Sequence, residues 1–258
     1  MTFGNEAMPM VKDAAPGVAP KAKELLSYAK SLGLASLEEC GQLDASGYRR
    51  FHCNPLELLV DVGNVSPSYQ PGHAHADELN FLLFDNGEPL VVDTGISTYE
   101  KNDRRQLERS TQSHNCAYLP SHNSSQVWGG FRVARRAGVS ILKESDTQLE
   151  ACHNGYRHLG VMIYRSFVVE EKALIVSTRT VSKATTSVRQ YLHFHPDKKV
   201  TLTDKGASVG NIRLTLSGFE EISKEKYMFA SGFNQLVEAE RIVLTSSSEN
   251  TIKFSNVN

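Results

Sequence analysis

Short runs of β-branched and aromatic residues recur from about Tyr48 to the C-terminus, and turn-forming residues separate them. Polar clusters such as Asp85-Asn86-Gly87 stand between consecutive runs. This spacing of strands and turns is typical of antiparallel sandwiches. The runs expected to form strands are 56–62, 79–84, 89–93, 132–142, 161–169, 173–181, 187–194, 212–216, 235–240, 242–244 and 251–254. The chain is therefore predicted to be all-β, with a large antiparallel β-sandwich.

One helix is predicted ahead of the strands. Apolar residues recur at helical spacing from Pro20 to Leu34, and Pro20 and Gly33 suit its first turn and its end. A single amphipathic helix cannot bury its apolar stripe alone. It is expected to pack either on the sheet that follows or on a helical domain outside this chain. The chain is thus divided into a helical segment, 1–45, and a β-domain, 46–258.

Charge and composition exclude several classes of partner. The sequence has 28 Lys plus Arg against 29 Asp plus Glu, so it offers no strong electrostatic case for nucleic acid or an anionic membrane. No apolar stretch approaches the roughly 18 to 20 residues of a membrane span. The first residues also lack the basic start and apolar core of a signal peptide. The four cysteines form no CxxC pair, which favours free thiols over a thiolate zinc site or disulfides.

Histidines and an aspartate form the sharpest local pattern. In extended chain, His73 and His75 would point to the same face. The turn at residues 85–87 would bring the strand that ends at Asp93 back antiparallel, so that Asp93 could approach His75. His114 lies in a polar excursion, 97–126, expected to fold back over the strand ends. Two imidazoles and a carboxylate are acceptable ligands for Zn²⁺, although a structural, hydrogen-bonded role for each histidine stays open.

Two further patterns carry a weaker signal. His193 and His195 repeat the HxH spacing, but no acid follows them on a paired strand, which favours a structural role. Arg132, Arg135 and Arg136 cluster and could meet an acidic ligand, or could form an ordinary solvated strand face.

Three blocks in this order resemble the heparinase II/III-like polysaccharide lyases: GHAHADELNFLLFDNGEPLVVDTGISTYE, RRQLERSTQSHN and SQVWGGFRVARRA. The resemblance is most specific between Gly72 and Ala137. It implies a supersandwich-like β-domain that is normally preceded by an (α/α) toroid, with the sugar in the canyon between them. The segment 1–45 resembles the end of that toroid.

The resemblance also implies residue roles. His75, Asp93 and His114 correspond to the zinc ligands, and His73 to a histidine that faces the substrate and serves as acid or base. The residues that fall in the substrate-binding motifs are Tyr99, Arg109, Asn115, Trp128 and Arg135.

The reaction implied by the resemblance is β-elimination at a uronic acid of an acidic polysaccharide. The C5 proton is removed and the C4 oxygen leaves. The zinc would hold loops and orient the neighbouring histidine rather than activate water. Much of such a catalytic site comes from the toroid, so this chain is expected to carry only part of it, with the toroid upstream or on another chain. A periplasmic or secreted location is implied by the resemblance alone.

Three alternatives remain at this point. A cupin-like metal protein also uses an HxH motif, but it would place a glutamate four or five residues after the second histidine, and Glu78 follows His75 by three. A non-catalytic glycan-binding module would use Trp128, Tyr99 and the arginines without elimination. A zinc hydrolase is disfavoured because no glutamate stands in an HExxH relation to a histidine pair.

Overall fold

A computed structural model describes residues 8–34, 46–67 and 69–257, and its strands lie in antiparallel sheets. The first four-stranded sheet has the order β1 (Tyr48–Cys53), β2 (Leu56–Asp61), β3 (Phe81–Asp85) and β4 (Glu88–Val91). The second has the order β16 (Glu221–Gly232), β17 (Gln235–Ser246), β12 (Val188–His193) and β5 (Ala117–Tyr118). A main-chain bridge between Val91 and Phe194 joins these two sheets at their edges.

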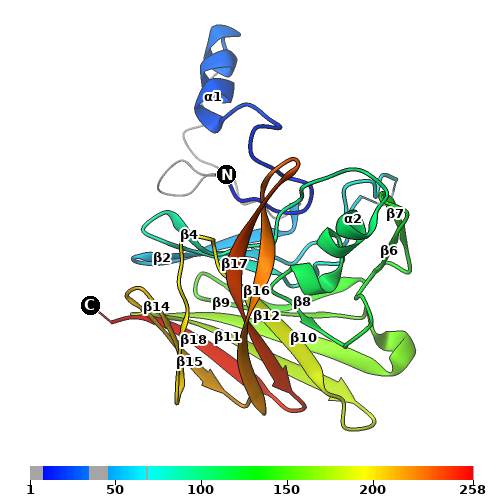
Figure 1. Cartoon of the computed structure of the whole chain (residues 1–258), viewed down its shortest axis with the longest axis vertical. Helices are drawn as coiled ribbons and strands as arrows, with labels where there is room; N and C mark the ends of the chain where they lie inside the picture. The colour runs from blue at the N-terminus through cyan, green and yellow to red at the C-terminus, as the bar shows by residue number, and fades with distance from the viewer. Residues whose placement is uncertain (1–7, 35–45, 68, 258) are drawn as a thin grey trace.

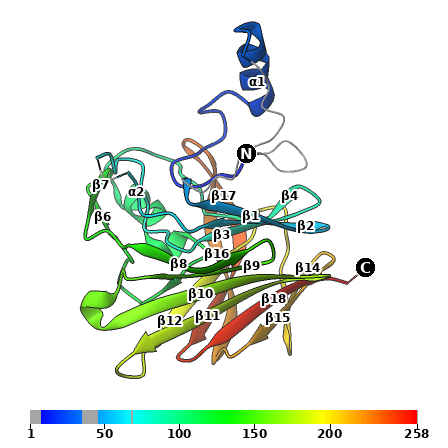
Figure 2. The same ribbon diagram turned by 180° about the vertical axis from the view of Figure 1, so that it is seen from behind.

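An eight-stranded sheet lies opposite them. Its order is β13 (Thr201–Thr203), β14 (Gly206–Val209), β15 (Ile212–Ser217), β18 (Asn250–Asn256), β11 (Ala173–Ser182), β10 (Val161–Glu170), β9 (Gln148–His153) and β8 (Val139–Ser145). Figure 2 shows β10, β11, β18 and β15 side by side, with β1 to β3 lying over them. A small hairpin of β6 (Gln126–Trp128) and β7 (Arg132–Ala134) stands at one end.

The hydrophobic core fills the space between these sheets. Alternate residues of β2, Leu56, Leu58 and Val60, are buried in a cluster that also takes side chains from β10, β11, β12, β17 and β18. Phe81 of β3 meets both Phe167 and Phe254 of the opposite sheet, edge to face, at ring distances of 6.1 Å. Inward-facing residues at period two are what a sandwich requires, so the predicted all-β sandwich is confirmed.

Some predicted strand boundaries are wrong, for local reasons. The run 132–142 forms two strands in different sheets, β7 and β8, because Arg135 takes a left-handed conformation with φ of 41°. Runs 235–240 and 242–244 form one strand, β17. The run 79–84 begins only at Phe81, since Leu79 has φ of 60° in a turn. The long strand β16 escaped prediction because its first half is solvated on both faces.

The predicted helix is present as α1 (Ala22–Ser31), but none of its residues is buried. Leu26 is 70% exposed and Tyr28 is 63% exposed. Figure 1 shows α1 standing clear of the sheets, so of the two packing partners expected for it, the sheet that follows is wrong. The predicted boundary at residue 45, and residues 35–45, lie outside the described residues. In the described ranges, no helix is long and apolar enough to cross a membrane.

Ahead of α1, residues 8–20 form what we call the N-terminal arm. Val11 of this arm packs against Leu59, Leu82 and Phe84, on the face of the β1–β4 sheet that points away from the core. Lys12 donates to Asp61 and Asp77 at 2.7 and 2.9 Å. The arm is thus held by apolar contact and by ion pairs.

The polar excursion 97–126 is ordered by its own structure. It contains α2 (Asp103–Glu108), a 3-10 turn η2 (Thr111–Ser113) and β5. The Asn102 side chain caps α2 by accepting from the Arg105 N–H at 2.9 Å. The Thr94 N–H donates to the Ser113 carbonyl at 3.2 Å, so the excursion returns to the end of β4, as expected. This return brings His114 under the strand ends.

Candidate functional site

The segment that carries His73 and His75 is a fixed loop rather than a strand. Arg109, which is fully buried, donates from Nε and one terminal nitrogen to the Ala74 carbonyl at 3.0 and 2.9 Å. The Ala76 N–H donates to the Arg109 carbonyl at 3.0 Å. With its main chain held in this way, the segment directs His73 outward, with 67% of its side chain exposed, and buries His75 at 1%.

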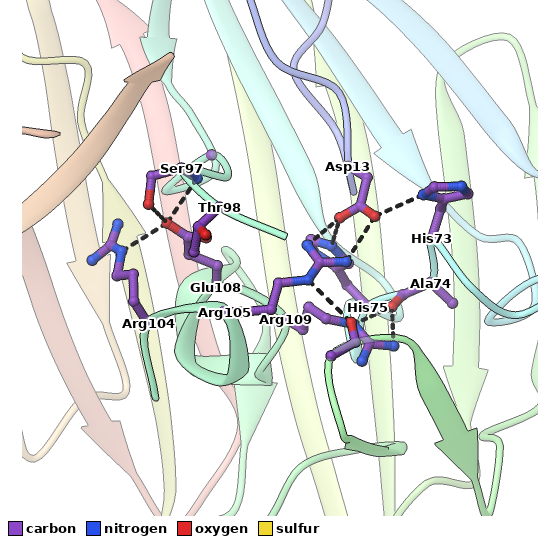
Figure 3. A network of polar contacts seen from close by, with 12 residues as sticks. Asp13, His73, Ala74, His75, Ser97, Thr98, Arg104, Arg105, Glu108 and Arg109 are labelled. Atoms are coloured by element: carbon purple, nitrogen blue, oxygen red, sulfur yellow. Dashed lines mark hydrogen bonds and ion pairs between the residues drawn. The ribbon is translucent and has the colours of Figure 1, made fainter. Parts of the chain in front are cut away.

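Both histidines converge on a carboxylate from the N-terminal arm. Asp13 Oδ2 lies 2.8 Å from His73 Nδ1, and Asp13 Oδ1 lies 2.8 Å from His75 Nε2 (Figure 3). Arg105 of α2 binds the same carboxylate with both terminal nitrogens, one of them at 2.7 Å. Spacing predicted that the two rings point to the same face of an extended chain, and it did not identify Asp13 as the carboxylate that both rings contact.

The electrostatics of this cluster fix its charge states. Burial lowers the pKa of His75 to about 3, so this imidazole is neutral at physiological pH. Burial alone would raise the pKa of Asp13, but the hydrogen bonds from His75 and Arg105 outweigh it and hold the pKa below its usual range. An ionised carboxylate can only accept a hydrogen bond, so a neutral imidazole beside it must donate one through its N–H. His75 therefore carries its hydrogen on Nε2.

The other side of His75 faces the remaining predicted zinc ligands. His75 Nδ1 lies 3.3 Å from His114 Nε2, and His114 Nδ1 lies 3.1 Å from Asp93 Oδ2. Asn80 donates to Asp93 Oδ1 at 2.8 Å. Burial opposes protonation of His114, but the attraction of Asp93 prevails and raises the pKa of His114. The three predicted ligands are thus in contact as a chain, with His114 in the middle.

These residues fit a metal in their chemistry, though not yet in a converging arrangement. Asp93 Oδ2 and His114 Nδ1 are buried, and within the described residues neither makes a hydrogen bond of acceptable geometry. The carboxylate oxygen, and the imidazole nitrogen once it has given up its proton, can bind a cation. In residues 8–34, 46–67 and 69–257, however, no three His, Cys, Asp or Glu side chains surround a point where an ion could sit.

Beside His73, half-buried Tyr99, Phe131 and Phe233 and exposed Trp128 form what we call the aromatic rim. The Tyr99 ring lies 6.1 Å from the His73 ring and packs edge to face on Phe131 and Phe233. Trp128 is 44% exposed, and the Arg132 guanidinium stacks on it at 4.7 Å. Arg109 joins the histidine segment to the Trp128 part of the rim, since it donates to the Ala74 carbonyl and also to the Trp128 carbonyl at 3.5 Å.

The other predicted substrate contacts lie elsewhere. Arg135 is exposed and lines a different pocket, of about 450 Å³, together with Arg136, Arg157 and His158. Arg109 and Asn115 have no exposed surface. Asn115 donates to the carbonyls of Phe81 and Val92 at 2.9 and 3.0 Å. This burial does not support the predicted contact of Arg109 or Asn115 with substrate, and both residues brace the main chain instead.

The second HxH pair is structural, as its surroundings suggested. His193 is fully buried, with Nδ1 3.3 Å from the Asn115 side chain and Nε2 3.4 Å from Arg241. Burial holds the pKa of His193 well below its usual value. His195 lies at the edge, 3.4 Å from Asp197.

Glu78, which follows the histidine segment, provides a test of buried charge. It is 3% exposed and accepts from the hydroxyls of Ser124 and Ser125. Burial raises the pKa of Glu78, so the folded chain holds this proton at a pH where the unfolded chain has released it. Unfolding free energy is therefore lost as pH rises from the unfolded pKa through the raised folded one.

A Glu78→Gln variant should lack this loss, since the serine hydroxyls can turn to accept from the amide. Its unfolding free energy relative to the parent is expected to increase between pH 4 and pH 7, measured by urea denaturation at each pH. Glu171→Gln, in an exposed turn, is the matched control. Parallel pH profiles for the parent and the Glu78 variant would contradict this account.

One family model matches most of the chain, and several solved structures share its fold. The family described as "Heparinase II/III-like, C-terminal" matches residues 36–256. The heparan sulfate lyase of Pedobacter heparinus shares the fold with a TM-score of 0.73 and 14% identity, over 99% of this chain and 44% of that one. A structure described as a heparinase III-BT4657 gene product has a TM-score of 0.70 and 16% identity, over 98% and 44%.

Another structure, described as heparinase III, has a TM-score of 0.61 and 15% identity, over 82% of this chain and 35% of that one. No curated protein matches the chain. The chain spans about 44% of the length of the first of these structures. The family match also displaces the cupin-like alternative. Because it extends over residues 36–256, well over half of the sequence, the chain belongs to the heparinase II/III-like C-terminal family.

Proposed function

We propose that this chain is the sandwich part of a polysaccharide lyase that eliminates across a uronic acid of an acidic glycan. The observation that carries the proposal is His73, an exposed imidazole that is bound through Nδ1 to a buried carboxylate and lies beside the Tyr99 ring. The family match supports the same class of reaction. The solved structures named heparinase III and heparan sulfate lyase, at 16% and 14% identity, support the fold.

The chemistry needs a group that moves a proton at the sugar. Elimination removes the C5 proton of the uronic acid and expels the C4 oxygen, which takes a proton as it leaves. His73 can serve as that acid or base because its ring is exposed and its Nδ1 is fixed. Tyr99 and Trp128 would contact the sugar, and Arg135 would contact an acidic group further along the glycan. The group that neutralises the uronate carboxylate would come from an (α/α) toroid.

We also propose that His75, Asp93 and His114 hold one zinc ion. The support is the donor set of two imidazoles and a carboxylate, together with the two buried atoms that lack hydrogen bonds, His114 Nδ1 and Asp93 Oδ2. When bound, the ion would tie the excursion to the histidine loop and so support the neighbouring His73.

The test is the formation of unsaturated uronyl ends, followed by their ultraviolet absorbance, with a panel of uronic-acid polymers. The chain is assayed alone and together with the toroid of a structurally similar lyase. A His73→Ala variant is expected to lose about 100-fold to 10,000-fold in rate, the usual contribution of an acid–base group. His52→Ala, at an exposed histidine of β1, should keep the parent rate.

Three outcomes separate the candidates. A loss confined to the His73 variant supports the proposal, and equal rates in both variants contradict it. Glycan binding without any unsaturated product, with or without a toroid, would favour the non-catalytic glycan-binding module. The exposed Trp128 with its stacked Arg132 is the observation that keeps this second candidate open.

A further inference from the structure

We propose that Asp13 is a positioning residue that sets the orientation and the tautomer of both His73 and His75, so that the N-terminal arm is a working part of the site. The inference rests on the proposed function for what the two histidines do. The geometry that carries it stands independently, in the contacts of one carboxylate.

Asp13 is placed to organise the site from inside the protein. Its side chain is 5% exposed, and its two oxygens are shared among His73, His75 and the fully buried Arg105. Arg105 is itself fixed, because its Nε donates to the Gly130 carbonyl at 3.0 Å and its guanidinium lies 5.0 Å from the Tyr99 ring. One carboxylate therefore connects the arm, the histidine loop, α2 and the aromatic rim.

The chemistry of the carboxylate decides which ring nitrogens carry hydrogen. An ionised carboxylate only accepts hydrogen bonds, so each imidazole must donate to it. His75 donates from Nε2, which leaves the Nδ1 lone pair facing His114. His73 donates from Nδ1, which leaves Nε2 free on an exposed ring. Asp13 thus selects opposite tautomers in the two histidines, and each tautomer directs a lone pair to where the proposed function needs it.

The arm is held in the conformation that makes this contact possible. Lys12 has φ of 53°, a left-handed conformation that residues other than glycine rarely adopt. The turn is closed by the Ala14 N–H, which donates to the Val11 carbonyl at 3.0 Å. On one side of the turn Lys12 binds Asp61 and Asp77, and on the other side Asp13 enters the site. Strained backbone of this kind persists where surrounding contacts fix it.

The depth of the contact places Asp13 inside the protein. With the arm in place, His75 and Arg105 are at most 1% exposed, and of the three side chains that contact Asp13 only His73 is open to solvent. Asp13 thus lies beneath the exposed ring.

The direct test reads the tautomers in the metal-free chain by two-bond proton–nitrogen correlation of ¹⁵N-histidine. The parent should show His75 with hydrogen on Nε2 and His73 with hydrogen on Nδ1. Asp13→Asn keeps the shape but can accept from only one ring, so one of the two histidines should change its pattern. Asp13→Ala removes the acceptor altogether, so neither His73 nor His75 should keep its fixed tautomer. The zinc affinity of the Asp13→Ala variant is expected to be about 10-fold to 100-fold lower than that of the parent, the usual effect of losing a group that orients a ligand.

Asp197→Ala is the matched control, because it removes an exposed carboxylate beside another histidine, His195, and leaves Asp13 and its arm unchanged. The tautomers of His73 and His75 in Asp197→Ala should match the parent. The inference is overturned if Asp13→Asn and Asp13→Ala leave both tautomers unchanged, if Asp197→Ala reproduces their effect, or if Asp13→Ala binds glycan or turns it over better than the parent. If the parent binds no zinc while the tautomers respond to Asp13, the proposed zinc site fails and the inference stands.

Discussion

Replacing His114 by alanine is expected to weaken zinc binding by more than about 100-fold, above the range for groups that only orient a ligand. His114 is in contact with both other proposed ligands, 3.3 Å from His75 and 3.1 Å from Asp93. Its loss would leave two donors that do not touch each other. The measurement is competition for Zn²⁺ with a chromogenic chelator, together with the metal content of the purified chain.

Two controls make this result specific. His122→Ala removes an exposed histidine from the same excursion, and His193→Ala removes a buried one that contacts Asn115. Both variants should keep the zinc affinity of the parent. Full zinc content in the His114 variant, or equal losses in all three, would reject the proposed ligands.

The second large effect concerns stability and centres on Arg165. This arginine of β10 is 1% exposed, and it donates to the carbonyls of Leu79 and Asn115 and to the Gln190 side chain. Burial lowers its pKa to about 10, so it is charged at neutral pH. Arg165→Met should reduce the unfolding free energy by about 2 to 6 kcal/mol, because the buried carbonyls of Leu79 and Asn115 lose their donor at about 1 to 3 kcal/mol each, whereas Gln190 keeps the Thr178 hydroxyl.

Urea denaturation measures this loss against Arg179→Met. Arg179 belongs to the adjacent strand β11, is exposed, and stacks on the Tyr164 ring at 4.1 Å. Its replacement should cost less than about 1 kcal/mol. Similar losses in the two variants would mean that Arg165 acts through general packing rather than through the two carbonyl acceptors.

The sequence predicted the sandwich because inward-facing residues such as Leu56, Leu58 and Val60 alternate with a clear period. It could not predict β16, whose first half is solvated on both faces, so that its pattern carries no contrast. It could not separate β7 from β8, because only backbone conformation reveals the left-handed Arg135 between them. The periodicity of apolar residues reflects which side chains are buried. Where exposure is the same on both faces of a strand, or where the backbone turns, this periodicity predicts no strand boundary.

The candidate site was predictable wherever its residues lie close in sequence or on paired strands. His75 and Asp93 sit on segments joined through the β3–β4 hairpin, and His114 follows a polar excursion that had to return somewhere. Asp13 could not be found in this way. It lies about sixty residues before His73, on an arm whose path over the β1–β4 sheet depends on tertiary contacts of Val11 and Lys12. Arg105 could not be predicted either, since nothing in the sequence indicates that an arginine on a short helix is buried.

The position of the arm has a practical consequence for anyone who trims the protein to its recognisable portion. A version cut to the matched residues 36–256 would retain the hydrophobic core and every histidine discussed above, and it could pass as a well-folded domain. It would also lose Asp13, leaving Arg105 as a buried cation without its counter-ion. A lack of activity or of bound metal in such a shortened version would result from the loss of Asp13. An assay of the proposed site therefore needs a version that includes residues 8–20.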